Sequence, residues 1–297
     1  MSMPSLSRLA GRFSGQTPFG RWIFLLLGSA AVLRADPAAV RVVSQTVGTD
    51  ELLLALAAPA QIAALSELAQ DPEFSAVASQ AQGYPLLKPN GDAESVLKFR
   101  PTLVLCADYS RAELMAQLRR AGVRVLMFEH YMTLEDAYAN LRGLGRELGA
   151  EARAESLIGA CQQRTARLRR SLQGAKEVRV IAPSVYGPIP GADTTFQDLC
   201  DHAGAINLAS SLGHLRGHAL PPAEQMLTWP VDRMVLGGAD REKALAPFRH
   251  LSPYEFMDAV KAGRAVLIRP CLLSCVSFHR VDGYEELARA LHPEAFP

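Results

Sequence analysis

Aromatic, basic and sulfur-containing side chains gather in a few short loops of this chain, and their types suit the capture of a bulky ligand. Aromatic rings cover flat or bulky molecules, and arginines pair with carboxylates or with an anionic metal complex. The candidate binding residues are Tyr109 and Arg111 in "DYSR", Tyr186 in "SVYGPIPG", His214, Arg216 and His218 in "GHLRGHALP", and Cys275, Phe278 and His279 in "CLLSCVSFHR".

Most of these loops follow a predicted strand, and the strands predict an α/β fold. In residues 36–132, the runs Val40–Gln45, Ile62–Ser66, "TLVLCA" and "VRVLMF" read as buried strands separated by helical segments. Alternating helices and continuously apolar strands predict a parallel sheet covered on both faces. We expect one helix to start at "GTDELLLALA", with Thr49 as its N-cap and Asp50 and Glu51 in its first turn.

The middle of the chain lacks strand signals. Residues 133–173 contain no proline, and leucines recur there at helical spacing. We predict one long connecting helix, with a hairpin of two helices as the alternative, because Gly143, Gly145 and Gly149 could interrupt it. Residues 174–297 then restart the α/β pattern, with a helix capped by Thr195 and Asp198. The predicted fold is therefore two Rossmann-like α/β lobes with parallel sheets, joined by one long α-helix.

The N-terminus predicts export from the cytoplasm. Arg8, Arg12 and Arg21 precede the apolar run "WIFLLLGSAAVL", which is short for a membrane span. Residues 1–35 therefore read as a signal peptide cleaved after Ala35, with an uncleaved anchor as the alternative. No cysteine lies near Ala35, which argues against a lipid anchor. Three cysteines fall in apolar or helical segments, whereas a Cys271–Cys275 bridge is conceivable in an oxidising compartment.

Composition and motifs narrow the function classes. Lys plus Arg number 31 against 30 for Asp plus Glu, and this balance argues against nucleic-acid binding. The sequence contains no GxSxG, HExxH, P-loop or strand-linked GxGxxG motif. An enzyme is thus disfavoured, although a secreted hydrolase with a dispersed site between the lobes remains the alternative. An envelope signalling or adhesion module is a third class.

A short unit occurs twice, once in each predicted lobe. "AESVLKFRPTLVL" places Glu94 before an apolar pair, a proline and a strand, and "AEQMLTWPVDRMVL" repeats this order after Glu224. A glutamate at a helix start also interacts favourably with the helix dipole, by up to about 1 kcal/mol. Its recurrence in both lobes nevertheless favours a shared role at the surface.

With these units, "RVVSQTVGTDELLLALA" and "GADTTFQDLCDHAGAINLA", the chain resembles the helix-linked periplasmic binding proteins that serve ABC importers for cobalamin, ferric siderophores and haem. The resemblance implies a monomer without an intrinsic cofactor, which binds a metal chelate between its lobes. It also implies that Glu94 and Glu224 dock on arginines of a permease dimer. Tyr109 and His279 are candidate ligands of haem iron, whereas the metal site and the exact chelate stay open. No tryptophan-rich cleft points to cobalamin.

Overall fold

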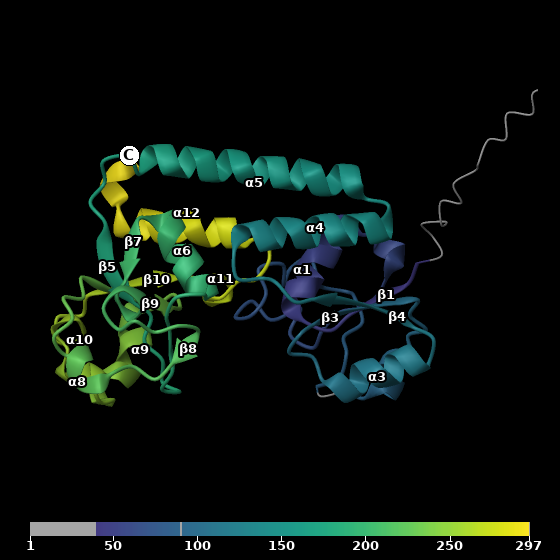
Figure 1. Ribbon diagram of the computed structural model, residues 1–297, viewed down its shortest axis with the longest axis horizontal. Coiled ribbons are helices and arrows are strands. Elements are labelled where there is room, and N and C mark those ends of the chain that lie inside the picture. Colours follow the sequence, from purple (N-terminus) through teal and green to yellow (C-terminus); the bar gives the residue numbers. More distant parts are fainter. Residues whose placement is uncertain (1–39, 90, 297) are drawn as a thin grey trace, which may run out of the picture. The chain divides into compact units, whose positions relative to one another are not determined.

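The N-terminal lobe is built on a parallel sheet, as predicted. The computed structural model describes residues 40–89 and 91–296, and the predicted signal peptide lies outside them. Four strands pair in the order β2-β1-β3-β4 (Figure 1). Along β3, Leu103 and Leu105 enter one apolar core while Val104 and Cys106 enter another on the opposite face. The elements are β1 (Val42–Ser44), α1 (Val47–Leu56), β2 (Ile62–Ala64), α2 (Ala93–Leu97), β3 (Leu103–Ala107), α3 (Ala112–Arg120) and β4 (Arg124–Phe128).

The N-cap of helix α1 lies three residues before the predicted one. Thr46 is the N-cap, and its side chain accepts a hydrogen bond from the Thr49 backbone N–H at 3.3 Å. The Thr49 hydroxyl accepts from the Thr46 backbone N–H at 3.2 Å, which completes a capping box. The predicted N-cap at Thr49 is therefore wrong. Because of this shift, Asp50 and Glu51 lie deeper in the helix, and both are buried.

The C-terminal lobe contains a second parallel sheet, in the order β10-β9-β5-β7, and a small antiparallel pair, β6-β8. Along β9, Val235 packs into the core shared with the N-terminal lobe, while Met234 and Leu236 pack into a separate core on the other face. Its elements are β5 (Val178–Ile181), β6 (Ile189–Pro190), α6 (Thr195–Ala203), β7 (Ala205–Asn207), α7 (Leu208–Ser211), β8 (His218–Ala219), α8 (Ala223–Met226), β9 (Arg233–Gly237), α9 (Arg241–Leu245), α10 (Asp258–Lys261), β10 (Ala265–Ile268), α11 (Pro270–Leu273) and α12 (Arg280–Leu291).

The cap of α6 also differs from the prediction by one residue. The Thr194 side chain, and not that of Thr195, accepts from the Gln197 backbone N–H at 3.2 Å. Asp198 therefore does not close a capping box. It is buried and pairs with Arg280 instead, with 2.9 Å between Nη1 and Oδ2.

The predicted single helix over 133–173 is wrong, because the segment forms two helices, α4 (Leu134–Leu148) and α5 (Glu151–Ser171). Gly149 ends α4 in the left-handed conformation, with φ of 65°. This conformation is easy for glycine and turns the chain back on itself. The two helices then pack closely, since a Cβ on Gly145 would lie 3.1 Å from that of Ala154.

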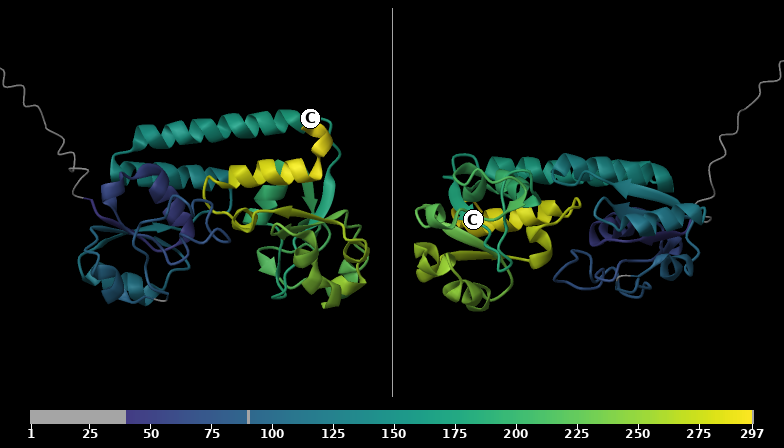
Figure 2. Two further views of the ribbon diagram at one scale, coloured as in Figure 1. Left: turned by 180° about the vertical axis from the view of Figure 1, so that it is seen from behind. Right: turned by 60° about the horizontal axis from the view of Figure 1, so that its bottom comes forward.

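Helix α5 is the segment of chain that leads from one lobe to the other. Helix α4 packs against α1 of the N-terminal lobe, whereas α5 contacts α4 at one end and α6 and α12 of the C-terminal lobe at the other. Figures 1 and 2 show α5 lying alongside both α4 and α12. With 21 residues, α5 is about 30 Å long. The connecting helix is therefore half the length of the predicted segment, and α4 belongs with the N-terminal lobe.

One apolar core extends through both lobes beneath these helices. It includes Leu53 of α1, Leu144 of α4, Ile158 of α5 and Leu287 of α12, all at most 1% exposed. No helix within residues 40–89 and 91–296 is both long enough and apolar enough to cross a membrane.

Candidate ligand-binding cleft between the lobes

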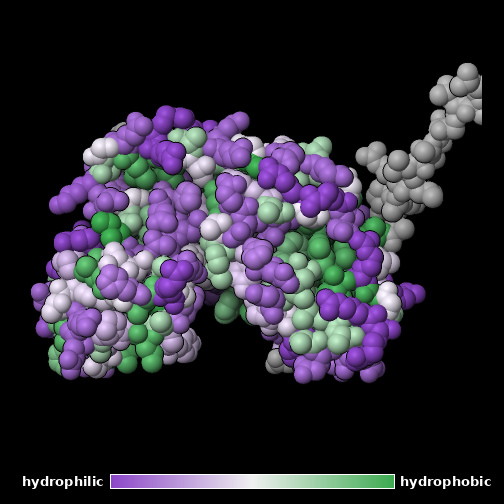
Figure 3. Space-filling view, viewed as in Figure 1, coloured by the Kyte–Doolittle hydropathy of each residue, from purple (hydrophilic) through white to green (hydrophobic). Residues whose placement is uncertain are grey.

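A cavity of about 720 Å³ lies between the two lobes. On the face drawn in Figure 3, the surface is hollowed between them. Tyr109 of the N-terminal lobe and Tyr186 of the C-terminal lobe both line the cavity and are 60% and 91% exposed. The lining residues are Gln45, Thr46, Val47, Gly48, Glu51, Ser66, Glu67, Leu68, Glu73, Phe74, Tyr109, Tyr186, Pro270, Cys271, Leu273, Ser274, Cys275 and Val276.

The ends of parallel strands position these side chains. Residues 45–48 follow β1, residues 66–74 follow β2, Tyr109 follows β3, and Pro270–Val276 follow β10. The carboxyl ends of parallel strands are the usual ligand-binding edge of an open α/β sheet. The lobes approach closely at this level, because a Cβ on Gly48 would lie 2.2 Å from the Val276 side chain. A larger residue at position 48 would therefore force the Val276 side chain to move.

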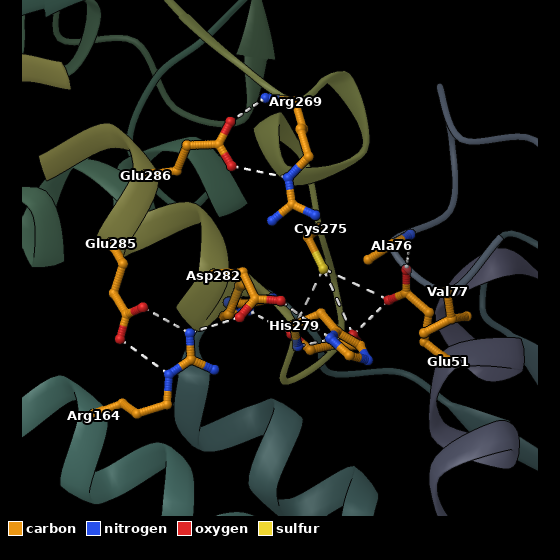
Figure 4. Close-up of polar contacts among 12 residues, drawn as sticks. Glu51, Ala76, Val77, Arg164, Arg269, Cys275, His279, Asp282, Glu285 and Glu286 are labelled. Carbon is orange, nitrogen blue, oxygen red and sulfur yellow. Dashed lines mark hydrogen bonds and ion pairs between the residues drawn. The ribbon is translucent and has the colours of Figure 1, made fainter. Parts of the chain in front are cut away.

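A buried carboxyl joins the lobes at the cavity. Glu51 of α1 accepts a hydrogen bond from the Ser277 hydroxyl at 2.5 Å and from the Cys275 thiol at 3.6 Å. Its other oxygen accepts from the Ala76 backbone N–H at 2.9 Å, and Figure 4 shows this carboxyl reaching across to Cys275. Burial raises the pKa of Glu51 above its usual value, which favours the neutral form.

Arg280 makes a second buried contact between the lobes. It is 2% exposed, and its guanidinium donates to the backbone carbonyls of Tyr131 at 2.6 Å and Met132 at 2.9 Å. The same group pairs with Asp198, and so the start of α12 is tied to the chain entering α4. Arginine suits this position because its planar head carries several fixed donors.

Tyr109 lies beside a second tyrosine. Its ring meets that of Tyr131 edge to face, with 5.8 Å between centroids and 89° between planes. The Tyr131 hydroxyl donates to Asp108 at 2.8 Å. Burial raises the pKa of Tyr109, which keeps its phenol protonated. The phenol can therefore stack on a ligand, or bind a metal that lowers its pKa.

Two further cavities adjoin the main one and contain two more predicted residues. Arg111 lines a cavity of about 310 Å³ that shares Tyr109 and Glu67 with the main cavity, and its guanidinium donates to the Gly91 carbonyl. His218 lines a cavity of about 690 Å³ on the other side, which shares Tyr186 and Glu73. The cleft is thus continuous from one lobe to the other.

Four of the predicted residues do not line these three cavities. Arg216 pairs with Asp193, and His214 lies in an exposed loop with φ of 52°. Phe278 is 8% exposed in the core, and His279 Nδ1 lies 3.3 Å from Asp282. The expected position of His279 in the cleft is wrong. Helix α11 intervenes after β10, and Phe278 and His279 come only at the start of α12, where His279 is the N-cap.

Glu51, Glu67, Glu73 and Phe74 also line the cavity, and sequence reasoning missed them. These residues follow the ends of β1 and β2. Binding residues commonly follow strand ends, and this signal was therefore present in the sequence. Glu51 was missed for another reason. The expected N-cap at Thr49 placed Glu51 in the first turn of the helix. The helix begins earlier, and Glu51 is buried.

The cysteines and His202 have structural positions. All five cysteines are buried and free, so the conceivable Cys271–Cys275 bridge does not form. Burial raises the pKa of Cys275 well above the usual thiol value. His202 stacks on Tyr284 at 4.2 Å between ring centroids, and its Nδ1 lies 2.8 Å from the Asp198 carbonyl, so its ring packs within the C-terminal lobe. Within the described residues, no group of His, Cys, Asp and Glu side chains is arranged to hold a metal ion.

Comparison with known proteins identifies the family. Residues 42–270, which form most of the chain, match the model of the periplasmic binding protein family. This chain belongs to the periplasmic binding protein family. This periplasmic binding protein is also 23% identical over 218 residues to an uncharacterized ABC transporter substrate-binding lipoprotein, YvrC of Bacillus subtilis, which covers 70% of this chain and 67% of the relative.

Solved structures share the fold. The periplasmic haem-binding protein RhuT of Roseiflexus sp. RS-1, in its apo form, superimposes with a TM-score of 0.75 at 19% identity, covering 86% of this chain and 99% of RhuT. A periplasmic haem-binding protein of Pseudomonas aeruginosa gives 0.72 at 24% identity, covering 86% and 94%. HutB of Vibrio cholerae, also a periplasmic haem-binding protein, gives 0.72 at 21% identity, covering 86% and 99%. The predicted fold of two α/β lobes with parallel sheets is confirmed.

Proposed function

We propose that this periplasmic binding protein captures a metal chelate of tetrapyrrole size, haem or a corrinoid, between Tyr109 and Tyr186. The observation that carries the proposal is the interlobe cavity of about 720 Å³, with an exposed tyrosine from each lobe. This volume falls within the range of about 300–1,000 Å³ that is typical of small-molecule sites. Several proteins of the same fold are haem-binding proteins, which supports this ligand class.

Each tyrosine has a defined part in this proposal. Tyr186 is almost fully exposed and offers its whole ring to a flat ligand. Tyr109 is held by Tyr131 and presents a phenol, which is a known ligand of haem iron. Metal coordination would release its proton, because a bound cation lowers the pKa of a ligating hydroxyl. The metal belongs to the transported chelate.

The site favours binding over hydrolysis. Ser66, Ser274 and Cys275 line the main cavity, but no histidine does so among the described residues. Within the described residues no hydrogen bond joins these serines to a histidine, as an activated serine would require, and the Ser66 hydroxyl instead donates to the buried Asp50 carboxyl. Burial also disfavours the thiolate of Cys275. A hydrolase with an interlobe site therefore has no support from this geometry.

Titration with candidate chelates tests the proposal. Mass spectrometry of protein purified from its native periplasm should first reveal a bound metal chelate. Tyr109→Ala and Tyr186→Ala should each weaken binding of that chelate by at least about tenfold, as expected for central aromatic contacts. Tyr109→Phe separates coordination from stacking, because it removes only the hydroxyl and should change the absorption spectrum of a bound haem.

Phe256→Ala is the matched control, since Phe256 is also exposed but lies outside the three cavities of the cleft. This control should bind normally. Normal binding by both tyrosine-to-alanine variants would show that the ligand site lies elsewhere.

We also propose that Glu94 and Glu224 dock the loaded protein on an ABC permease dimer. Both are exposed, in the first turns of α2 and α8. Helix α2 packs against α3. Figure 1 shows α3 and α8 at the ends of their lobes away from α5. Matched anions on the two lobes suit a basic surface repeated in two permease copies. We accordingly propose that the protein acts in the periplasm as a monomer. Residues 1–35 are its proposed export signal.

Charge reversal tests the docking surface. Glu94→Arg and Glu224→Arg should each reduce uptake of the chelate while leaving its affinity for the isolated protein unchanged, because like charges repel across an interface. Glu151→Arg, an exposed reversal in the first turn of α5 and away from the proposed docking surface, provides the control and should transport normally. Wild-type uptake by the double Glu94→Arg, Glu224→Arg variant would contradict the docking role.

A further inference from the structure

The described residues that line the main cavity include acidic side chains and no basic ones. Among its described lining residues, three are glutamates, Glu51, Glu67 and Glu73, and none is a lysine, arginine or histidine. A cleft built for an anionic chelate would be expected to present arginines, which bind carboxylates and anionic groups in fixed geometry.

Two of the three glutamates have no side-chain partner among the described residues. The Glu51 carboxyl is buried and already receives hydrogen bonds from Ser277, Cys275 and Ala76. Glu67 and Glu73 are exposed, and their carboxylates have no hydrogen bond or ion pair within residues 40–89 and 91–296. These two side chains therefore remain able to interact with a ligand.

Glu67 and Glu73 lie at different ends of the main cavity. Glu67 also lines the smaller cavity that shares Tyr109, whereas Glu73 also lines the C-terminal cavity that shares Tyr186. Each carboxylate thus accompanies one of the two exposed tyrosines. Carboxylates combined with aromatic faces attract cations, since the ring quadrupole adds to the negative charge.

The basic residues near the N-terminal end of the cleft line a different cavity. Lys88 and Arg111 line the smaller cavity and not the main one, and Arg111 donates to the Gly91 carbonyl. On the C-terminal side, His218 lines the neighbouring cavity together with Glu73.

We propose that Glu67 and Glu73 make the cleft selective for metal chelates without net negative charge, by contacting the cationic edge of the ligand. This inference rests on the proposed function and narrows it to a neutral or cationic chelate such as a corrinoid, because the two propionates of haem give it a net negative charge. Enclosing an anion beside two unpaired carboxylates is unfavourable, whereas a cation there gains two attractive partners.

Two porphyrins of the same size and opposite charge test the inference. Zinc tetra(N-methylpyridyl)porphyrin is cationic at its edge, and zinc tetra(sulfonatophenyl)porphyrin is anionic. Fluorescence titration of the full-length mature protein should show tighter binding of the cationic porphyrin. Glu67→Gln and Glu73→Gln should each weaken that binding by about two- to fivefold, as for exposed ion pairs, and should improve binding of the anionic porphyrin. Added salt should reduce the difference.

Control variants separate charge from cavity. Glu113→Gln removes an exposed carboxylate outside the cleft and should leave both affinities unchanged. Tyr186→Ala should weaken both porphyrins if they occupy the cleft. Equal or tighter binding of the anionic porphyrin, still lost in Tyr186→Ala, would overturn the charge selectivity and leave the proposed function standing. Binding of neither porphyrin would contradict the proposed function, and the charge inference with it.

Discussion

Asp50 and Glu51 are consecutive residues of α1, yet their buried carboxyls serve different contacts. Glu51 reaches the C-terminal lobe, where it receives hydrogen bonds from Ser277 and Cys275. Asp50 stays within its own lobe and accepts from the Ser66 backbone N–H at 3.0 Å and from the Ser66 hydroxyl. Successive residues of a helix point about 100° apart, which explains the divergence.

Asp50 should make stability depend on pH. Burial raises its pKa from 3.8 to about 7, and so the folded protein holds a proton there that the unfolded chain releases. Between about pH 4 and pH 7 the folded state binds more protons, and its free energy of unfolding should fall as pH rises, by up to about 1.4 kcal/mol per pH unit. Above about pH 7 this contribution is lost.

Urea unfolding of wild type and Asp50→Asn across this pH range measures the effect. The amide oxygen of asparagine can still accept from Ser66 but does not titrate. The difference in free energy of unfolding between the two proteins should therefore change with pH, in the direction of losing the wild-type advantage as pH rises. Parallel curves would show that Asp50 is charged in the folded state.

The turn between α4 and α5 depends on its glycine. Gly149 has a left-handed backbone, whereas Gly143 lies in the interior of α4, where an added Cβ would meet no other atom within 4 Å. Gly149→Ala should lower the free energy of unfolding by about 1–2 kcal/mol, because a Cβ is strained in that conformation. Gly143→Ala should raise it by about 1 kcal/mol, through helix propensity.

Thermal or urea unfolding of the two variants makes the comparison directly. Each variant adds the same methyl group, and so opposite signs can only come from the backbone conformation. A stabilising Gly149→Ala change would mean that α4 and α5 can rearrange towards a continuous helix.

At the scale of the whole molecule, the lobes share more than the connecting helix. One apolar core runs through α1, α4, α5 and α12. The buried contacts of Glu51 with Ser277 and of Arg280 with the Tyr131 and Met132 carbonyls cross between the lobes. Wide opening would break these hydrogen bonds and expose packed side chains, each of which is costly.

We therefore predict a rotation of only a few degrees between the lobes when the chelate binds. Small-angle scattering with and without ligand should give nearly equal radii of gyration. A marked decrease on binding would demonstrate a hinge, and Gly149, where the left-handed turn interrupts the helical segment, would be its first candidate. Gly149→Ala should then alter the decrease.

The sequence by itself determined the class of fold and much of the chemistry of the cleft. Continuous apolar runs such as "TLVLCA" require burial on both faces, and local turn chemistry placed the helices to within a few residues. Tyr109, Tyr186 and Cys275 could be predicted for the main cavity, because binding residues follow strand ends. Their roles in binding stay predictions.

Only the tertiary structure decided the remaining features. Whether residues 133–173 form one helix or two depends on packing, since Gly145 must meet Ala154 and Gly149 must adopt positive φ. His279 left the cleft because α11 intervenes, and Glu51 entered it because α1 starts at Val47. Such outcomes depend on contacts between residues far apart in the chain, as Glu51 and Ser277 are. Local sequence patterns do not encode which distant residues meet.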